Sequence, residues 1–422
     1  MLRNKFIASL CAAALLGAYT PFPAAAVDFD QGVSVRGLVV KAQKAAQTST
    51  TKELAGKKVA TQNLDDKVER RIVVFKGSTS QTRRMSLVRD TGGIPTKNLW
   101  LINAVAVVIP NVKAASVDRN LAAMSEVVRV EKDFVQNWLV GAPAVAEEDT
   151  GASGQNVPWG IKRVNAEAAW PVTRGAGVKV AVIDTGIDFD HPDLEVAGGY
   201  NAIDNNVSYK DDNGHGTHCA GTIAAKDNGE GVVGVAPDVT LYGVKVLSAS
   251  GSGTFEGVID GIQWAVKNKM QIASMSLGAS QGNQALADAI AAAKEAGTTI
   301  VAAAGNSGRA VGYPAAYPEA IAIAASDSSD KVAYFSSRGP EVDLIAPGVS
   351  VYSTYMGGGY RSLSGTSMAC PHAAGLAALA VANGASGFDA VMAALQSAAT
   401  KFDGVPDTQQ GAGMVDAGKL VN

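Results

Sequence analysis

The sequence predicts an α/β protein whose main domain is a doubly wound, mostly parallel sheet, preceded by a small α+β domain. From residue 151 onward, apolar runs such as VKVAVID (178–184) and TTIVAAAG (298–305) alternate with helical stretches such as GVIDGIQWAVKNK (257–269). Strands that are apolar at every position are buried on both faces, which is typical of parallel sheets covered by helices. The alternation favours a doubly wound arrangement, and about 270 residues fit one such domain.

The smaller domain is predicted from residues 71–133, where the elements follow another order. The predicted elements are a strand at 71–76, a helix at 79–90, one or two strands at 99–110, a helix at 111–124 and a strand at 127–133. This β-α-β-β-α-β order is ferredoxin-like, with two helices on one face of a small sheet. Residues 28–70 are polar with little periodicity, which indicates a loose N-terminal extension.

The first 26 residues have the pattern of a secretory signal peptide. Arg3 and Lys5 precede the apolar stretch FIASLCAAALLGAY, and residues 24–26 are three alanines that suit cleavage. The apolar stretch is shorter than the roughly 20 residues that span a bilayer. No later stretch is long and apolar enough for an anchor. The sequence therefore predicts a secreted, extracellular protein without a membrane partner.

Charge and cysteine content narrow the possible partners. Residues 27–150 hold 18 Lys and Arg against 14 Asp and Glu (net +4), whereas residues 151–422 hold 16 against 25 (net −9). Opposite charges favour association of the two parts, and the acidic main domain argues against nucleic acid as a partner.

Cys219 and Cys370 are expected to be buried free thiols rather than a disulfide or a nucleophile. A monomer is expected.

Three segments place a serine, a histidine and an aspartate where nucleophilic catalysis needs them. Ser367 lies where the Gly-rich turn of SLSGTSMACPHAAGLAALA (362–380) leads into an apolar helix, whose free N–H groups can receive a developing negative charge. His215 opens a second small-residue helix. Asp184 ends a buried strand, at the edge where open α/β sheets build their sites. A serine hydroxyl needs a base, and the base needs an orienting carboxylate.

Each of these residues also has a non-catalytic interpretation. Ser367 could cap its helix, Asp184 could cap a turn, and His215 could be a hydrogen-bonded polar residue. Their joint occurrence in one chain favours catalysis. His215 and His218, three residues apart, could also ligate zinc. No third ligand is evident, so a structural role for His218 is the better interpretation.

Four segments, three of which contain Asp184, His215 and Ser367, resemble the subtilisin family of serine proteases: VAVIDTGID, NGHGTHCAGT, VAAAGNSG and SGTSMACPHAAG. The similarity extends from about Gln155 to the C-terminus, and the chain order aspartate, histidine, serine is the one known from subtilisin. The resemblance implies that Asp184 orients His215, that His215 takes the proton of Ser367, and that Asn306 helps to hold the oxyanion.

The small domain resembles the inhibitory propeptide of subtilisins, through the strand NAVAV (103–107) and the segment VVRVEKD (127–133). The resemblance implies a self-processed precursor whose own propeptide templates folding and blocks the cleft. The implied domains are a signal peptide (1–26), a propeptide (27–150, with its folded part at 71–133) and a peptidase domain (151–422), with the cut in the linker 141–153.

Two further segments resemble the edges between which subtilisins bind a peptide as an added strand, LSASGSGTF (247–255) and SLGAS (276–280). The implied substrate-binding residues are Gly251, Ser252, Gly253, Ser276, Leu277, Gly278, Ala303, Ala304 and Gly305. None of these side chains is acidic, so protein or peptide substrates with large apolar or varied side chains are expected, rather than Lys or Arg. The loop from Asn306 to Tyr313 is shorter than in the best-known members.

The resemblance also implies a structural Ca²⁺ ion near the start of the peptidase domain. Calcium takes six to eight oxygen ligands from carboxylate, amide and main-chain carbonyl groups. The implied ligands are the side chains of Gln155, Asp193 and Asn228 and the backbone carbonyls of Lys226, Glu230 and Val232. The alternative is an ordinary polar surface loop.

Two other functions compete with that of a protease. A lipase-like esterase shares acyl-enzyme chemistry, but the segment GTSMA lacks the second glycine of the nucleophile elbow, and the order of the three residues differs from that fold. A binding protein that kept the fold without catalysis is disfavoured, because all four catalytic positions are present.

Overall fold

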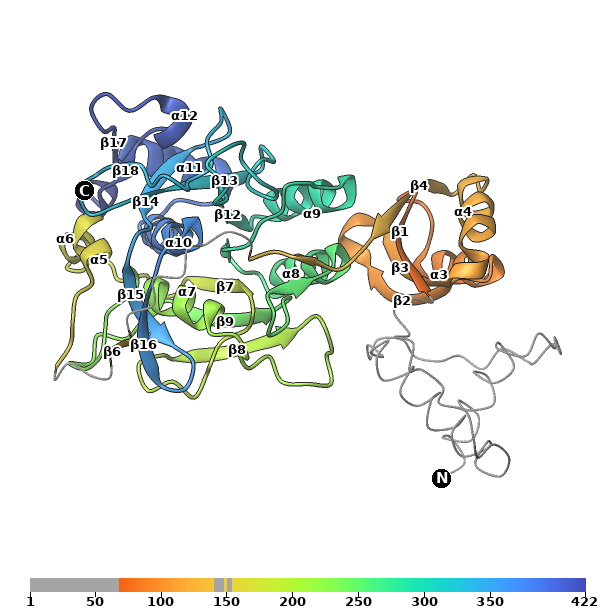
Figure 1. Cartoon of the computed structure of the whole chain (residues 1–422), viewed down its shortest axis with the longest axis horizontal. Coiled ribbons are helices and arrows are strands. Elements are labelled where there is room, and N and C mark those ends of the chain that lie inside the picture. The colour runs from red at the N-terminus through yellow and green to blue at the C-terminus, as the bar shows by residue number, and fades with distance from the viewer. Residues whose placement is uncertain (1–67, 140–147, 150–153) are drawn as a thin grey trace, which may run out of the picture. The chain divides into compact units, whose positions relative to one another are not determined.

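The computed structural model describes residues 68–139, 148–149 and 154–422, which form two compact units (Figure 1). The small unit holds most of residues 68–132, and the large unit holds most of the remainder. The predicted signal peptide and residues 28–67 of the predicted loose extension lie outside the described residues, as does most of the predicted linker; residues 68–70, predicted as part of that extension, instead begin the strand β1 (Val68–Phe75). Within the described ranges, no helix is long and apolar enough to cross a membrane.

The small unit is a four-stranded sheet with two helices, in the predicted order of elements. In sheet order the strands are β2 (Ile94–Leu99), β3 (Ala104–Pro110), β1 (Val68–Phe75) and β4 (Val127–Asp133), and the helices are α3 (Gln81–Asp90) and α4 (Ala114–Ala122). A 3-10 turn at Trp100–Ile102 separates β2 from β3. Both helices cover the same face of the sheet, because one buried cluster contains Val73, Phe75, Val88, Val105, Val107, Val117 and Leu121.

The large unit is built on a seven-stranded sheet in which each neighbouring pair of strands is parallel. In sheet order the strands are β14 (Leu344–Pro347), β13 (Ala320–Ser326), β12 (Thr299–Ala303), β11 (Ile272–Met275), β7 (Lys179–Asp184), β9 (Thr240–Lys245) and β8 (Val196–Asn201). On one side of β7 the strands β11, β12, β13 and β14 follow outward in chain order, whereas on the other side the chain passes first to the edge strand β8 and then returns to β9, next to β7. The carboxyl end of β7 therefore lies where the strand order reverses. The predicted doubly wound α/β fold is confirmed.

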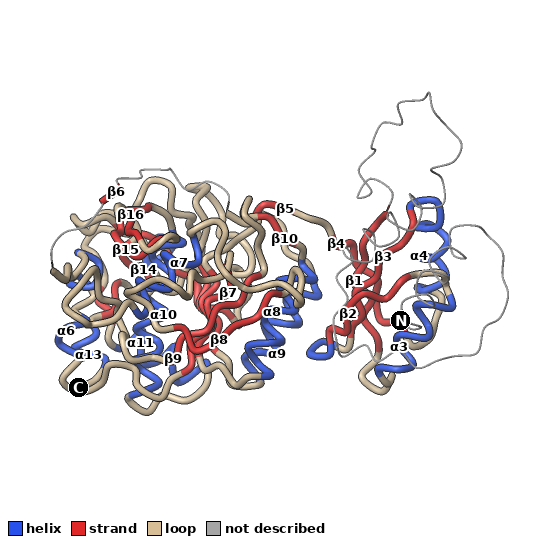
Figure 2. Tube along the Cα trace, turned by 90° about the horizontal axis from the view of Figure 1, so that it is seen from below, coloured by secondary structure: helices blue, strands red, loops and turns tan. Residues whose placement is uncertain are grey.

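Helices cover both faces of this sheet. Figure 2 shows α7 (His215–Ala224), α10 (Thr366–Ala382) and α11 (Phe388–Ser397) on one side of the strands, and α8 (Phe255–Lys267) and α9 (Gln284–Glu295) on the other. As a result β11, β12 and β13 are buried at every residue, which explains their uninterrupted apolar sequences. Helix α10 packs against α7, so the two small-residue helices predicted to carry the serine and the histidine are neighbours.

Shorter elements complete the large unit. The helices among them are α5 (Trp159–Arg163), α6 (Ala166–Ala169), α12 (Asp407–Gln410) and α13 (Ala417–Leu420). The strands are β5 (Gln136–Asn137), β6 (Glu148–Asp149), β10 (Ser252–Gly253), β15 (Val351–Tyr355), β16 (Gly359–Leu363), β17 (Ala399–Thr400) and β18 (Met414–Val415). Strands β15 and β16 form an antiparallel hairpin that precedes α10.

Candidate active site

The carboxyl end of β7 brings Asp184 to His215. Asp184 is fully buried, and its Oδ1 lies 2.8 Å from Nδ1 of His215, the first residue of α7. The same oxygen accepts a hydrogen bond from the Thr185 backbone N–H at 2.7 Å. Gly214, just before the helix, has a φ of 100°, which favours glycine, and a Cβ there would meet the ring of Tyr355. The turn into α7 therefore depends on this glycine to place the histidine.

The electrostatics of this pair favour a positively charged imidazole. Burial alone lowers the pKa of His215, but the negative charge of Asp184, the neighbouring Cys219 sulfur and the hydrogen bonds to both more than compensate, so the pKa is raised well above its usual value. Oδ2 of Asp184 is buried and has no hydrogen-bond partner among the described residues. The described hydrogen bonds of this carboxylate are therefore made by Oδ1 alone, to His215 and to the Thr185 backbone.

Ser367 is the second residue of α10 and is almost completely buried. Its hydroxyl donates to the backbone carbonyl of Ser276 at 3.0 Å, and the Ser276 hydroxyl donates to the carbonyl of Ser367 at 2.8 Å. Cys219 contacts both catalytic candidates, since its Sγ lies 3.4 Å from the Ser367 carbonyl oxygen and 4.0 Å from Nδ1 of His215. The packing of α7 on α10 thus brings both residues to Cys219, while the described hydrogen bonds join His215 to Asp184 and the Ser367 hydroxyl to Ser276.

Asn306 follows β12, and its side-chain amide is held in one orientation. Its Oδ1 accepts hydrogen bonds from the backbone N–H and the hydroxyl of Thr366, at 2.8 and 3.0 Å. The Thr366 oxygen in turn accepts the N–H of Gly305 at 3.1 Å. Because Oδ1 is occupied twice by the residue preceding Ser367, the amide nitrogen of Asn306 is the group left to donate to a substrate oxygen.

The predicted peptide-binding edges are both paired with a segment of the chain itself. Strand β5 pairs antiparallel with β10, with Asn137 opposite Ser252 and Gln136 opposite Gly253. The next residue, Trp138, donates its N–H to the Gly251 carbonyl and accepts the N–H of Gly278, each at 2.9 Å. Residues 136–138 therefore lie between the two edges as an added strand. Of the remaining predicted pocket residues, Ser276, Leu277, Ala303 and Ala304 are buried, and Gly305 is partly exposed.

Trp138, which is not among the predicted site residues, anchors this segment. Its side chain is 1% exposed, its ring packs edge-on against Phe255 at 5.2 Å, and its Nε1 donates to the Gly253 carbonyl at 3.1 Å. Phe134 meets the same phenylalanine ring at 5.5 Å. The signal available in the sequence was the pair of aromatic residues in FVQNWL, directly after the last predicted strand of the small domain.

All six residues implied for Ca²⁺ are linked by hydrogen bonds. The side-chain amide of Gln155 contacts the carbonyl oxygens of Lys226 and Val232 at 2.7 and 3.2 Å, and the two oxygens of Asp193 contact Asn228 Nδ2 and the Val232 N–H at 3.1 and 2.8 Å. The sixth residue, Glu230, donates its backbone N–H to the side-chain oxygen of Asn228 at 2.9 Å.

The chemistry of this cluster fits a hard cation. Asp193 is 1% exposed and forms no ion pair with a described Lys or Arg, and burial raises its pKa to about 6. Two main-chain carbonyls converge on the Gln155 amide, and turning that amide would present its oxygen beside them. A buried carboxylate among amide and carbonyl oxygens matches what calcium binds.

His218 and the two cysteines of the described residues have structural roles. Nε2 of His218 lies 2.9 and 3.0 Å from the carbonyl oxygens of Val351 and Arg361, so this nitrogen is not available for a metal. Cys219 and Cys370 are both free and buried. The expected free thiols are thus found, and the zinc alternative for His215 and His218 gains no support.

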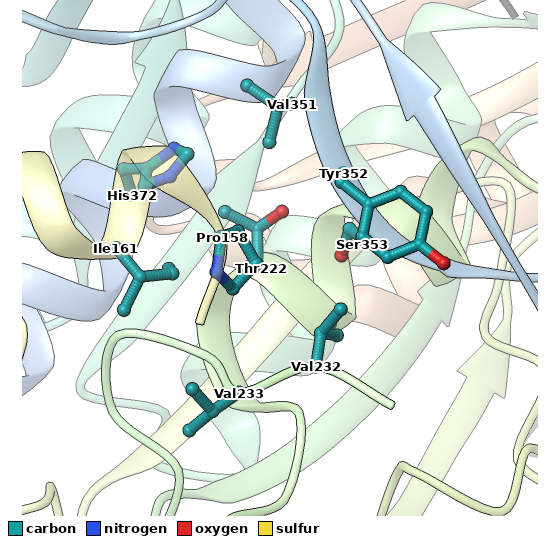
Figure 3. Close-up of a pocket in the computed structure, with 10 residues that line it drawn as sticks. Pro158, Ile161, Thr222, Val232, Val233, Val351, Tyr352, Ser353 and His372 are labelled. Carbon is teal, nitrogen blue, oxygen red and sulfur yellow. The ribbon is translucent and has the colours of Figure 1, made fainter. Parts of the chain in front are cut away.

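Figure 3 shows a hollow beside residues 158–161. It is too small to admit a water molecule. Its lining joins the N-terminal segment to α7, β15 and α10, through Pro158, Ile161, Thr222, Val351 and His372 among others. It is an imperfection in packing and not a substrate site.

Comparison with known proteins identifies the family. Residues 175–413, more than half of the chain, match the Subtilase family. Alkaline elastase YaB of Bacillus sp. (strain YaB) is 48% identical over 281 residues, covering 65% of this chain and 74% of that protein. Subtilisin DY of Bacillus licheniformis is 51% identical over 231 residues (53% and 84%), and subtilisin E of Bacillus subtilis (strain 168) is 42% identical over 318 residues (73% and 79%). The chain therefore belongs to the subtilase family and is a subtilisin-like serine protease.

Proposed function

We propose that this protease is a secreted endopeptidase in which Asp184, His215 and Ser367 form the catalytic triad and Asn306 donates to the oxyanion. The observation that carries the proposal is the 2.8 Å contact between Asp184 and His215, on a helix that packs against the helix of Ser367. An aspartate at Nδ1 fixes the tautomer in which Nε2 is the free base.

The reaction follows from these positions. The Ser367 hydroxyl turns from the Ser276 carbonyl to give its proton to Nε2 of His215, while its Oγ bonds to the peptide carbonyl carbon. The negative charge that forms on the carbonyl oxygen is held by the Ser367 backbone N–H and the Asn306 amide. His215 then protonates the leaving amine, and the C–N bond breaks. A water molecule repeats the sequence and releases the acid.

The specificity we propose is broad with an apolar preference. The edges at 251–253 and 276–278 bind backbone, as their pairing with residues 136–138 supports. The pocket that receives Trp138 is aromatic, since it is built on Phe255. The predicted pocket for the substrate side chain next to the cut bond is walled by residues 276–278 and 303–305. These residues carry small or apolar side chains without charge, which favours apolar substrate residues over Lys or Arg.

We also propose that residues 27–150 are a propeptide that inhibits the enzyme and templates its folding. Two observations support this. The segment directly after the small unit occupies the peptide-binding edges. The alignment with subtilisin E covers 73% of the chain, more than the 272 residues of 151–422 can supply. If a chain lacking 27–150 refolds to full activity as fast as the complete chain, the templating role is wrong.

A structural calcium ion is the third part of the proposal. Gln155, Asp193, Asn228 and the carbonyls of Lys226 and Val232 would hold it, together with the Glu230 carbonyl by resemblance. The ion would neutralise the buried Asp193 carboxylate and fasten the start of the peptidase domain to the loop after α7. It has no part in bond cleavage.

One experiment separates this function from its rivals. The wild-type chain and Ser367→Ala are tested for labelling by a fluorophosphonate and for cleavage of casein and of a fatty-acyl ester. The protease predicts labelling and casein cleavage, both lost in Ser367→Ala. Ester hydrolysis without casein cleavage would indicate an esterase, and absence of labelling would indicate a binding protein.

A further inference from the structure

Lys245 is a buried lysine outside the proposed triad. Its side chain is 5% exposed, yet its ammonium group has a partner for each of its three protons. Nζ donates to the backbone carbonyls of Thr185 and Leu247 at 2.7 and 2.8 Å, and to Oδ1 of Asp212 at 2.6 Å. Burying an ammonium group is costly unless it is fully paired. Because all three protons of the Lys245 ammonium are bonded, the side chain holds its three partners in fixed positions relative to one another.

The three partners belong to three different parts of the site. Thr185 follows Asp184, and Asp212 lies three residues before His215 in the turn that leads into α7. Leu247 begins the segment whose residues 251–253 pair with the chain's own added strand. One side chain therefore joins the end of the aspartate strand, the approach to the histidine helix and the start of the peptide-binding edge.

Backbone hydrogen bonds next to Lys245 also join the edge segment to the strand that ends at Asp184. Lys245 lies opposite Asp184 in the pairing of β7 with β9. The N–H groups of Val246 and Leu247 both donate to the Asp184 carbonyl, at 2.9 and 3.1 Å. Beyond these bonds the chain leaves the sheet, and the Lys245 ammonium is the next described link between the edge segment and the aspartate strand.

We propose that Lys245 is a positioning residue that holds the edge 247–253 in register with the Asp184–His215 pair. This inference rests on the proposed function. Contacts that bind a peptide several residues from the cut bond help the reaction only if that bond then lies correctly at Ser367. Without Lys245, the edge still binds but no longer presents the bond correctly. The loss therefore falls on long peptide substrates and spares substrates that do not reach the edge.

The test compares substrate lengths in Lys245→Met, which keeps the chain length but removes the ammonium. The substrates are a four-residue peptide anilide and a single-residue N-acetyl ester with the same terminal residue. We expect kcat/KM for the anilide to fall about 10- to 100-fold, and kcat/KM for the ester to change by less than about 3-fold. Fluorophosphonate titration sets the active-enzyme concentration, so poor processing does not count as lost activity.

The matched control is Lys401→Met, which removes an exposed lysine paired with Asp407 at 2.7 Å and should leave both substrates unaffected. Equal losses on both substrates in Lys245→Met, or no loss on the anilide, would overturn the proposal. If Lys245→Met does not fold, Asp212→Asn serves instead, because Asp212 is half exposed and its loss leaves the two carbonyl bonds. The same length-dependent pattern is expected, about 2- to 5-fold in size; without it, the proposal is also overturned. Casein cleavage that survives in Ser367→Ala would refute the proposed function separately.

Discussion

At the scale of single residues, the fixed amide of Asn306 makes a kinetic prediction. Because Thr366 occupies the amide oxygen, the amide nitrogen can stabilise a charge that exists only in the transition state. Asn306→Ala should lower kcat about 10²- to 10³-fold with little change in KM, a magnitude known for the equivalent donor in subtilisin. Steady-state kinetics on a peptide anilide measure this. Thr366→Ser, which keeps the hydroxyl, is the control and should stay close to wild type. An unchanged kcat in Asn306→Ala would exclude it from the oxyanion site.

The raised pKa of His215 makes a second prediction, about pH. The imidazole must be neutral to accept the serine proton, so activity rises with pH as His215 loses its proton. Because Asp184 raises that pKa well above 6.5, the acid limb of kcat/KM should have its midpoint above pH 6.5. A pH–rate profile on a neutral substrate measures the midpoint. A midpoint below pH 6.5 would mean that Asp184 does not stabilise the imidazolium.

The sequence identifies some of these residues and misses others, for a physical reason. Asp184, His215, Asn306 and Ser367 lie in segments whose glycines and small residues impose a particular backbone, so the pattern is visible in one dimension. Lys245 acts through main-chain carbonyls of Thr185 and Leu247. Carbonyls are the same at every position of a chain, so such contacts leave no signature in the sequence.

At the scale of elements, the strand that the chain adds to its own cleft depends on Trp138. Removing a fully buried aromatic side chain costs about 3–5 kcal/mol where the site cannot collapse. Trp138→Ala should therefore weaken the hold of residues 136–138 on β10, and the full-length chain should gain casein-cleaving activity sooner. The time course of activity after secretion measures this. Val135→Ala, at an exposed neighbouring position, should follow the wild-type time course. An unchanged time course in Trp138→Ala would show that this strand does not limit activation.

Elements differ in how well the sequence predicts them. The buried strands β11, β12 and β13 are predictable, because burial on both faces demands continuous apolar sequence. Strand β8 has the sequence VAGGYN and lies at the edge of the sheet, where pairing on one side tolerates glycine and polar residues. The two-residue strands β5 and β10 exist only as each other's partners. No local propensity could have indicated them.

At the scale of the whole molecule, the proposed calcium site joins the start of the peptidase domain to the loop after α7. An ion that binds only the folded form stabilises it by mass action, and more so as its concentration rises. The inactive Ser367→Ala chain should therefore melt at a higher temperature in calcium than in EGTA. Asp193→Ala in the same background should lose most of this response, because it removes the carboxylate of the cluster. Asp227→Ala is the matched control, since Asp227 lies in the same loop but pairs with Arg174 at the surface. Equal melting temperatures with calcium and EGTA, or a full response in Asp193→Ala, would remove calcium from this site and leave Asp193 as a buried carboxylate held only by its hydrogen bonds to Asn228, Val232 and Tyr360.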